Sequence, residues 1–156
     1  IMSYAIYLQQ QNDRNLMKIK HLYERALSQS PNNPTYLASY ALFLDGDLND
    51  HTAAKDKFEA SLKIDPDNAT TLTSFAATLM KSKEEREAGR IEELYRHALE
   101  IEPENELTLI AYGQFLQLFH QDLQGARDRY RKALSINPNN EVAAKLLDKT
   151  SFQSHP

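Results

Sequence analysis

The fold is decided by one stretch of sequence: LASYALFL at positions 37–44, AKDKFEAS at positions 54–61, and Pro66. Large and small apolar residues recur in it three and four positions apart, which is the spacing of one face of an α-helix. The same frame returns in 72–103 and 109–138, and a copy shortened at its start occupies 1–31. The four closing prolines lie 35, 37 and 35 residues apart. A period near this length predicts an array of helical repeats.

The bulk composition narrows the class of protein. Apolar residues make up 41% of the chain, charged residues 26%, and the formal net charge is −4. No basic stripe stands out, so the electrostatic signature of a nucleic-acid binder is missing. The chain has no cysteine, which excludes disulfides and thiolate metal sites. No apolar run approaches the roughly 20 residues of a membrane span. We expect a cytoplasmic or nuclear protein that does not enter membranes.

The period divides the chain into successive helix pairs. We expect a single repeat domain over residues 1–150, with repeats at about 1–33, 34–68, 69–105 and 106–140, a capping helix at 141–150 and a flexible tail at 151–156. Asn and Asp side chains stand where helices should begin, and there they accept hydrogen bonds from free backbone N–H groups. The expected caps are Asn15, Asn33 and Asp50, and the pairs Asp67-Asn68, Glu104-Asn105 and Asn139-Asn140 repeat the cap after the later prolines. The first repeat starts in mid-helix, so we expect a fragment of a longer protein.

These repeats resemble the tetratricopeptide repeat family, whose frame is a large apolar residue, Leu-Gly-x-x-Tyr, then Ala-x-x-x-Phe and a closing Pro. The resemblance covers nearly the whole chain, in three full copies and one partial copy. It implies an all-α, right-handed superhelical solenoid of antiparallel helix pairs, each pair packing only on its neighbours. The chain departs from the frame in having no Trp, in having Ala for Gly in three copies, and in longer inner turns, the longest lying between Leu79 and Ile91.

A related helical repeat, the half-a-tetratricopeptide type of RNA-processing scaffolds, is the alternative. The segments LYERAL at 22–27 and ARDRY at 126–130 resemble its second helix. Its first helix, however, is rich in Trp and carries a fixed Glu, and neither feature occurs here. The tetratricopeptide resemblance is therefore favoured.

The resemblance also implies that the first helix of each pair lines a concave, peptide-binding groove. Helical spacing identifies the residues that each first helix turns outward. They are Thr35, Ala38, Ser39 and Leu42; Thr70, Thr73, Ser74, Ala77 and Lys81; and Leu107, Ile110, Ala111, Gln114 and Gln117. This surface lacks the clamp of Lys, Arg and Asn with which some members of the family hold acidic chaperone tails, so we expect a neutral or apolar segment. For Leu107, Ile110 and Ala111, packing under the terminal helix is the alternative.

The sequence offers little for metal binding or catalysis. Asp45, Asp47 and Asn49 match the first ligand positions of a calcium loop, but Asp50 follows where the loop needs its glycine. A turn followed by an N-cap is the better interpretation. The histidines are scattered, no two of them lie within one turn of each other on one helix, and the sequence shows no grouping of a base with a nucleophile. We expect no enzymatic activity and no cofactor or metal.

Tyrosines mark the pattern and suggest a second kind of partner. Tyr4, Tyr23, Tyr40, Tyr95, Tyr112 and Tyr130 all occupy pattern positions. They could stack on the bases of single-stranded RNA, but their register predicts packing between helices. Tyr7 lies outside the pattern and is expected to be exposed.

The sequence therefore predicts an adaptor that holds a protein or peptide segment in its concave groove, with no direct nucleic-acid partner. Three alternatives remain. One is an RNA-processing scaffold of the half-a-tetratricopeptide type. Another is self-association through an uncovered apolar end, at Ile1–Leu8 or Val142–Leu147. The third is a targeting arm of a larger enzyme whose catalytic domain lies outside this chain.

Overall fold

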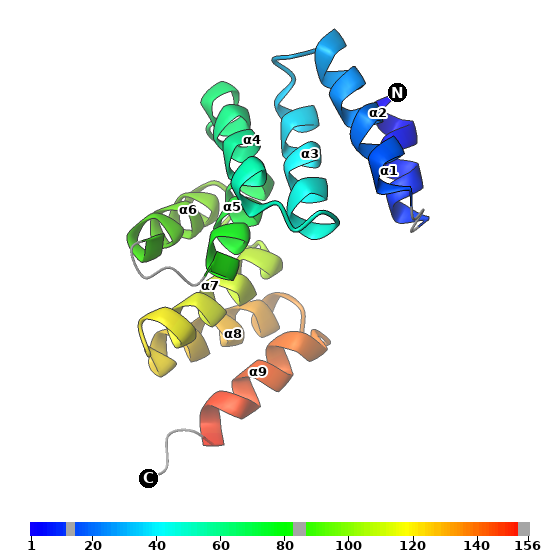
Figure 1. Ribbon diagram of the computed structural model, residues 1–156. Coiled ribbons are helices and arrows are strands. Elements are labelled where there is room, and N and C mark those ends of the chain that lie inside the picture. The colour runs from blue at the N-terminus through cyan, green and yellow to red at the C-terminus, as the bar shows by residue number, and fades with distance from the viewer. Residues whose placement is uncertain (12–14, 83–86, 153–156) are drawn as a thin grey trace. The chain divides into compact units, whose positions relative to one another are not determined.

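The computed structural model describes residues 1–11, 15–82 and 87–152, and these residues form helices joined by short turns (Figure 1). The helices are α1 (Met2–Gln10), α2 (Leu16–Gln29), α3 (Pro34–Gly46), α4 (His51–Ile64), α5 (Ala69–Ser82), α6 (Ala88–Ile101), α7 (Glu106–Phe119), α8 (Leu123–Ile136) and α9 (Glu141–Phe152). Contacts divide the chain into two compact units, Ile1–Thr78 and Leu79–Pro156. No helix in the described ranges is long and apolar enough to cross a membrane.

The helix starts follow the predicted caps. The side chains of Asn15, Asn33, Asp50, Asn68, Asn105 and Asn140 each accept a hydrogen bond from the backbone N–H three residues later, at 3.0 Å. Pro34 occupies the first turn of α3, where its missing N–H is not needed. Asp122 caps α8 in the same way. The cap at Asp122 was not predicted, although aspartate is a common N-cap residue, as at Asp50.

One boundary differs from expectation. Helix α9 continues to Phe152, so the first two residues of the predicted tail are helical; residues 153–156 lie outside the described ranges. In the long charged turn, Lys81 and Ser82 end α5 and α6 begins at Ala88. Part of the charged stretch therefore extends the two flanking helices, and residues 83–86 are outside the description.

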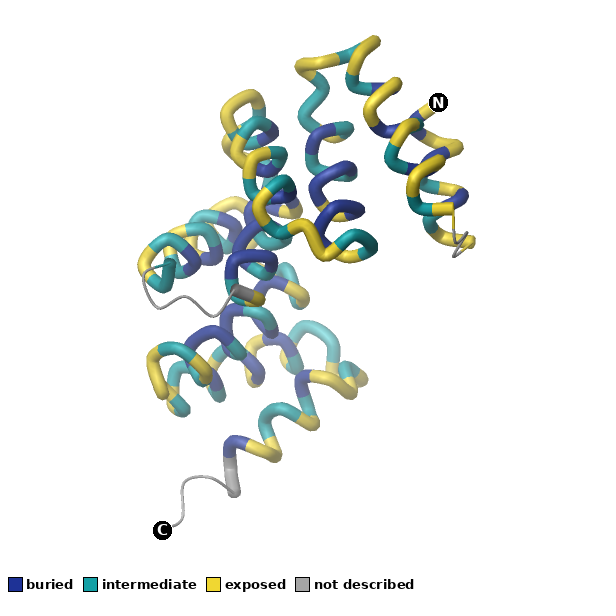
Figure 2. The backbone as a smooth tube through the Cα atoms, in the orientation of Figure 1, coloured by how far each residue is buried: buried dark blue, intermediate teal, exposed yellow. Residues whose placement is uncertain are grey.

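The first unit is built from α1 to α4 and most of α5, with small residues inside each pair and aromatic residues between pairs. Ala41 and Ala54 are fully buried where α3 and α4 pack together. Between pairs, the ring of Tyr23 on α2 lies 5.3 Å from that of Tyr40 on α3, and Phe58 on α4 lies 5.4 Å from Phe75 on α5. Figure 2 shows buried residues following one another along α3.

The second unit repeats this arrangement in α6 to α9. Tyr95 on α6 stacks on Tyr112 of α7 with ring centroids 5.8 Å apart. Gly113 lies against the ring of Tyr130 on α8, so α7 and α8 approach closely. A core cluster of Leu109, Ile110, Ala133 and Ala143 joins α7, α8 and α9.

Candidate functional site

A pocket of about 440 Å³ opens on the first unit between α1 and α3. Its walls come from residues far apart in the chain: Ile6, Gln9, Gln10, Tyr23, Ser39, Leu42 and Asp47. Ser39 and Leu42 belong to the outward side of α3 that helical spacing predicted. They face outward because Leu37, Tyr40 and Leu44 occupy the buried side of the same helix.

The polar side of the pocket is a chain of hydrogen bonds that links α2, α1 and the residue that follows α3. The hydroxyl of Tyr23 donates to Gln9 Oε1 at 2.8 Å, and Gln9 Nε2 donates to Asp47 Oδ2 at 2.6 Å. This chain holds the Gln9 amide in one orientation. Burial, and then the charge of Asp47, raise the pKa of Tyr23 to about 12. Tyr23 therefore stays a neutral donor at physiological pH, and Asp47 is the negative group of the pocket.

The apolar side of the pocket is provided by Ile6 and Leu42. Ile6 is half-buried, whereas Leu42 is 45% exposed. An apolar side chain from a ligand would cover Leu42 and remove more apolar surface from water, which is favourable. The half-buried hydroxyl of Ser39 lies on the same wall and offers both a donor and an acceptor.

Sequence reasoning did not point to Ile6, Gln9, Gln10, Tyr23 and Asp47 as residues that line this pocket. The signal for Ile6 was available, because it stands 36 residues before Leu42 and so occupies the same place in the shortened first repeat. For Asp47 no pattern was available, since it follows the last residue of α3. Its role depends on Gln9, which lies 38 residues away in the sequence.

The other predicted groove residues differ in how exposed they are. Of those on α3, Thr35 is exposed and Ala38 half-buried. On α5, Thr70 and Lys81 are exposed, and Thr73, Ser74 and Ala77 are half-buried. In the second unit, Leu107 is 75% exposed, while Ala111, Gln114 and Gln117 are half-buried. Exposure makes them available for contact, and whether they bind a ligand stays a prediction.

Ile110 is a correction to the predicted groove. Its side chain is 7% exposed and belongs to the cluster with Leu109, Ala133 and Ala143. The terminal helix α9 covers it, as the alternative interpretation of this position anticipated. Ile110 therefore contributes to the core and not to a binding surface.

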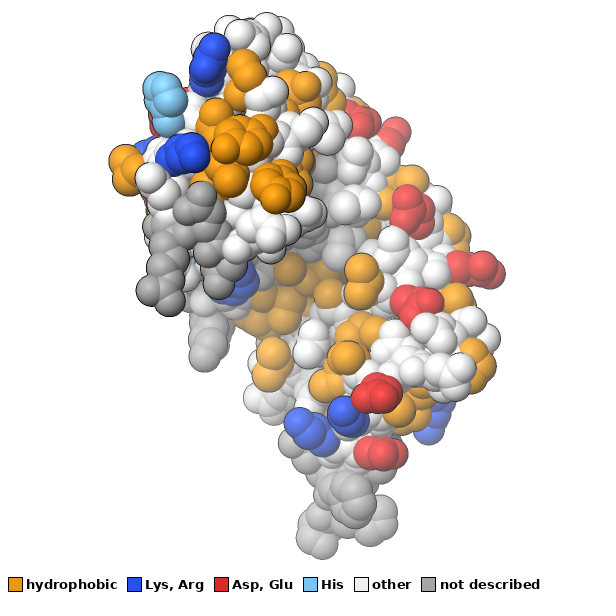
Figure 3. Space-filling model, turned by 90° about the vertical axis from the view of Figure 1, so that its right-hand side faces the viewer, with side chains coloured by type: hydrophobic (Ala, Val, Ile, Leu, Met, Phe, Trp, Pro, Cys, Tyr) orange, Lys and Arg blue, Asp and Glu red, His pale blue; other side chains and the backbone are white. Residues whose placement is uncertain are grey.

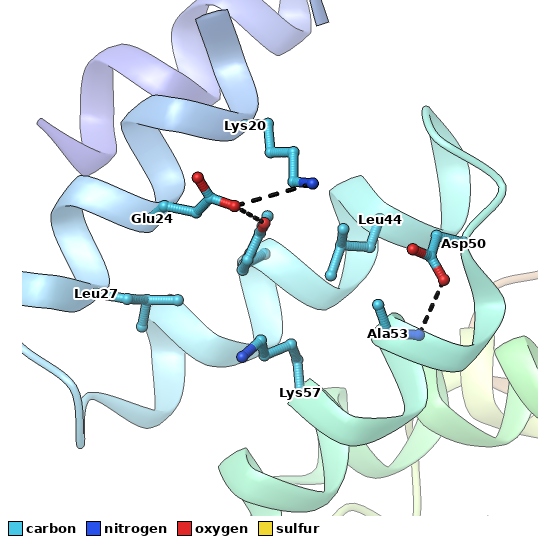
Figure 4. A pocket seen from close by; sticks show the side chains of 8 residues that line it. Lys20, Glu24, Leu27, Leu44, Asp50, Ala53 and Lys57 are labelled. Atoms are coloured by element: carbon cyan, nitrogen blue, oxygen red, sulfur yellow. Dashed lines mark hydrogen bonds and ion pairs between the residues drawn. The ribbon is translucent and has the colours of Figure 1, made fainter. Parts of the chain in front are cut away.

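A second pocket of about 400 Å³ lies among α2, α3 and α4 (Figure 4). Most of its charged groups already serve the fold: the Tyr40 hydroxyl donates to Glu24 at 3.2 Å, Lys20 pairs with Glu24 at 3.9 Å, and Asp50 caps α4. Of the contacts dashed in Figure 4, the one from Tyr40 to Glu24 joins α3 to α2, whereas the other two lie within α2 and at the start of α4. The α1–α3 pocket is the better candidate for a ligand because Leu42 and Ser39 are not used in this way.

The acidic turn after α3 is not arranged as a calcium loop. Asp45 Oδ1 lies 2.7 Å from His51 Nδ1, and Asp47 accepts from Gln9, so the two carboxylates serve different contacts. Asn49 adopts a positive φ of 52°, and Asp50 caps α4. Within the described ranges no group of three or more His, Asp or Glu side chains is placed to hold a metal ion.

Most of the pattern tyrosines pack between helices as predicted. Tyr23, Tyr40, Tyr95, Tyr112 and Tyr130 are all buried. Tyr4 is the exception, being 48% exposed, because no described helix covers its side of α1. Tyr7 is 54% exposed, which confirms the expectation for that residue.

No protein-family model and no curated protein matches the sequence. Solved structures do. PilF of Pseudomonas aeruginosa is 18% identical with a TM-score of 0.84, over 97% of this chain and 66% of PilF. MamA of Desulfovibrio magneticus RS-1, from residue 41 to the end, is 16% identical with a TM-score of 0.79, over 97% of this chain and 84% of that one. The first TPR of Spaghetti (RPAP3) bound to the HSP90 peptide SRMEEVD is 20% identical with a TM-score of 0.70, over 77% of this chain and 91% of that one.

The chain has the tetratricopeptide repeat fold. The predicted all-α solenoid of antiparallel helix pairs is thereby confirmed. At these identities the likeness establishes the fold, and the peptide in the RPAP3 structure is a property of that protein.

Proposed function

We propose that this chain is a non-catalytic adaptor that holds a segment of a partner protein in a groove that includes the pocket between α1 and α3 of its first unit. The pocket between α1 and α3 carries the proposal, because it combines an apolar wall with a fixed polar side. Leu42 and Ile6 would take an apolar side chain, and Ser39 would bond to the backbone of the bound segment. Because Tyr23 and Asp47 already hold Gln9, this surface loses little entropy when it binds.

The charge of the pocket favours a neutral or apolar segment over an acidic tail. Asp47 supplies a carboxylate, and no Lys or Arg is among the residues that line this pocket. A ligand carboxylate would meet Asp47 without a cation to balance it, and like charges at short range repel. The Asp47 oxygen that does not face Gln9 would instead accept from a donor on the ligand.

The test is selection of peptides from a random phage-displayed library on the purified chain. We expect enriched peptides with an apolar residue, and we expect Leu42→Arg to weaken their binding at least about tenfold, a loss of about 1.4 kcal/mol. Ile64→Arg is the matched control, because Ile64 is 44% exposed on the second helix α4 and does not line the α1–α3 pocket. Equal loss with both variants would contradict the proposal.

The acidic peptide SRMEEVD tests the charge argument separately. We expect it to bind this chain at least about tenfold more weakly than the selected peptides, because Asp47 repels it and no clamp of basic residues lines the α1–α3 pocket. Tight binding of SRMEEVD that Leu42→Arg abolishes would overturn the neutral-segment assignment while keeping the groove. Calorimetry of both peptides on one protein preparation makes this comparison.

A further inference from the structure

The pocket among α2, α3 and α4, which we call the Tyr40 pocket, has a counterpart in the second unit. Residues 72 positions further along the chain repeat these helices, so that α2 and α4 coincide in their bounds with α6 and α8. The second unit therefore provides an internal standard for the pocket. Half of the residues that line the pocket recur there unchanged: Leu27 as Leu99, Tyr40 as Tyr112, Leu44 as Leu116, and Asp50 as Asp122.

In the second unit an arginine of the chain itself lies on the tyrosine ring. The guanidinium carbon of Arg129, on α8, is 5.0 Å from the centre of the Tyr112 ring. The face of an aromatic ring is negative and attracts a cation, and a planar guanidinium can stack on it. The Tyr112 hydroxyl donates to Glu92 Oε1 at 3.0 Å, which places a carboxylate beside the same tyrosine. This unit thus fills the place with its own guanidinium.

In the first unit the same place is open. Lys57 stands where the second unit has Arg129, and lysine has no planar group that could lie flat on a ring. In Figure 4 the Lys57 side chain extends toward Leu27 and away from Asp50. A pocket of about 400 Å³ remains, with Tyr40 in its wall. The opening therefore results from a substitution within α4, because the repeat fills this place from its own second helix and needs no further helix to cover it.

Two carboxylates of the Tyr40 pocket keep an oxygen for a ligand. Glu24 accepts from the Tyr40 hydroxyl and pairs with Lys20 through Oε1, and Asp50 caps α4 through Oδ1. These contacts leave Glu24 Oε2 and Asp50 Oδ2. In the second unit a Cβ added at Gly125 would collide with Oδ2 of the capping aspartate. The first unit has Ala53 at that position, so Asp50 Oδ2 cannot occupy the equivalent place.

The pKa values of the two tyrosines reflect the same difference in charge. Burial, then Glu24 and then Asp50, raise the pKa of Tyr40. Burial and then Glu92 raise the pKa of Tyr112, but Arg129 acts in the opposite direction. A cation thus offsets the carboxylate at Tyr112, whereas both charged groups that act on the Tyr40 hydroxyl are carboxylates.

We propose that the Tyr40 pocket binds the guanidinium group of an arginine that a partner protein presents, at a site separate from the α1–α3 pocket. The guanidinium lies on the Tyr40 ring and donates to Glu24 Oε2 and Asp50 Oδ2, as a fork of several N–H donors can. Leu27 and Leu44 contact the apolar stem of the arginine. Lys57 is half-buried on a flexible stem, so its amine moves aside.

An anion is the competing ligand, because Lys20 and Lys57 also line the pocket. It is disfavoured because Lys20 is already paired with Glu24 and because two carboxylates would face it. Like charges at short range repel. In Figure 3 no broad patch of Lys and Arg side chains gathers on the described part of the face that is drawn, so a polyanion finds no extended basic surface there.

The test uses N-acetyl-L-arginine amide as the probe and two-dimensional NMR spectra of the isotope-labelled intact chain. We expect saturable shifts of the backbone amides of Tyr40 and Ala53. The equivalent amides of Tyr112 and Gly125 should not shift, because Arg129 covers that ring. The citrulline analogue has the same shape without the charge and should bind at least about tenfold more weakly, since hydrogen bonds from a charged donor are stronger.

Two reciprocal variants test the comparison between the units. Lys57→Arg should fill the Tyr40 pocket from within and weaken binding of the probe at least about tenfold, although it keeps the charge. Arg129→Lys should do the reverse and allow the probe to shift the Tyr112 amide. Lys63→Arg is the matched control and should leave binding unchanged, because Lys63 is exposed on α4 and does not line the pocket.

Several results would overturn the proposal. They are the absence of saturable shifts at Tyr40, equal binding of the citrulline analogue, and undiminished binding by a folded Lys57→Arg chain. N-acetyl-L-glutamate amide that shifts Tyr40 and loses this effect in Lys57→Gln would show an anion site instead. A doubled mass in light scattering that Lys57→Arg abolishes would assign the arginine to a second copy of the chain. If Lys57→Arg is unfolded, Glu24→Gln replaces it and should weaken the arginine probe more than the citrulline analogue.

Discussion

The residue that limits how closely α7 and α8 can pack is Gly113. The equivalent positions in the other repeats are Ala5, Ala41 and Ala76, which are fully buried. Among these four positions, Gly113 is the one without a side-chain methyl group. A Cβ built there would lie 2.5 Å from Cε1 of Tyr130, a ring that is itself fully buried and unable to swing away.

Gly113→Ala should therefore destabilise the chain, although alanine favours helix. We expect a loss of about 1–3 kcal/mol in the free energy of unfolding, the usual cost of overpacking a core. Urea denaturation followed by circular dichroism measures it. Gly89→Ala is the matched control, because nothing lies within 4 Å of its added methyl group. There we expect no loss and a gain of up to about 1 kcal/mol. A gain at both positions would show that α7 and α8 are not tightly packed.

At the scale of the helix, one hydrogen-bond pattern recurs within the pairs. The tyrosine hydroxyl of a second helix donates to a residue in the last turn of the first: Tyr23 to Gln9, Tyr95 to Met80 Sδ and Tyr130 to Gln117. In the α3–α4 pair the second helix has Phe58, which has no hydroxyl. There the residue at the equivalent place, Asp45, pairs with His51 instead. The aromatic residue of the second helix therefore decides whether the residue in the last turn of the first helix accepts from a hydroxyl or has another partner.

The asparagine caps make a separate prediction for the helices. Asn105→Ala removes the acceptor for the Thr108 N–H at the start of α7 and should cost about 1 kcal/mol of unfolding free energy. Asn105→Asp keeps an acceptor and should cost less. The control is Asn139→Ala, because Asn139 is exposed and α9 is capped by Asn140. Chemical denaturation of the three variants tests this, and equal losses for Asn105→Ala and Asn139→Ala would contradict it.

At the scale of the whole molecule, the buried tyrosines predict a loss of stability in alkali. Burial raises the pKa of Tyr23 and of Tyr130 to about 12, and it also raises the pKa of Tyr40, Tyr95 and Tyr112. In the unfolded chain a tyrosine titrates near pH 10. Above that pH unfolding releases protons, so stability falls as pH rises. Their contribution is complete below about pH 10 and is lost between pH 10 and 12.

The measurement is the melting temperature at pH 8 to 11.5, with absorbance at 295 nm reporting tyrosinate. We expect the melting temperature to fall above pH 10 and tyrosinate to appear together with unfolding. Tyr95→Phe removes one buried phenol, so its melting temperature should fall less steeply in the same range. An unchanged melting temperature at pH 11 would show that the tyrosines are not buried as described.

Calcium should have no effect on the whole molecule. We expect millimolar calcium to leave the melting temperature unchanged, because Asp45 pairs with His51 and Asp47 accepts from Gln9. Differential scanning calorimetry in calcium and in EDTA makes the comparison, with magnesium as the matched divalent control. A rise of several degrees in calcium alone would restore the calcium-loop interpretation of residues 45–49.

The sequence by itself determined the repeat period, the fold, the helix caps and the buried side of each helix. These features are local: a face repeats every three or four residues, and a cap involves residues three apart. The tertiary structure decided which outward residues stay accessible, because the accessibility of a side chain depends on helices that are distant in the sequence. Ile110 is buried by α9 whereas Leu107 is not, and Gln9 meets Asp47 only because α1 packs beside α3. Tyr4 follows the same pattern as Tyr40, yet it remains exposed because no described helix supplies the ring that Tyr23 supplies to Tyr40.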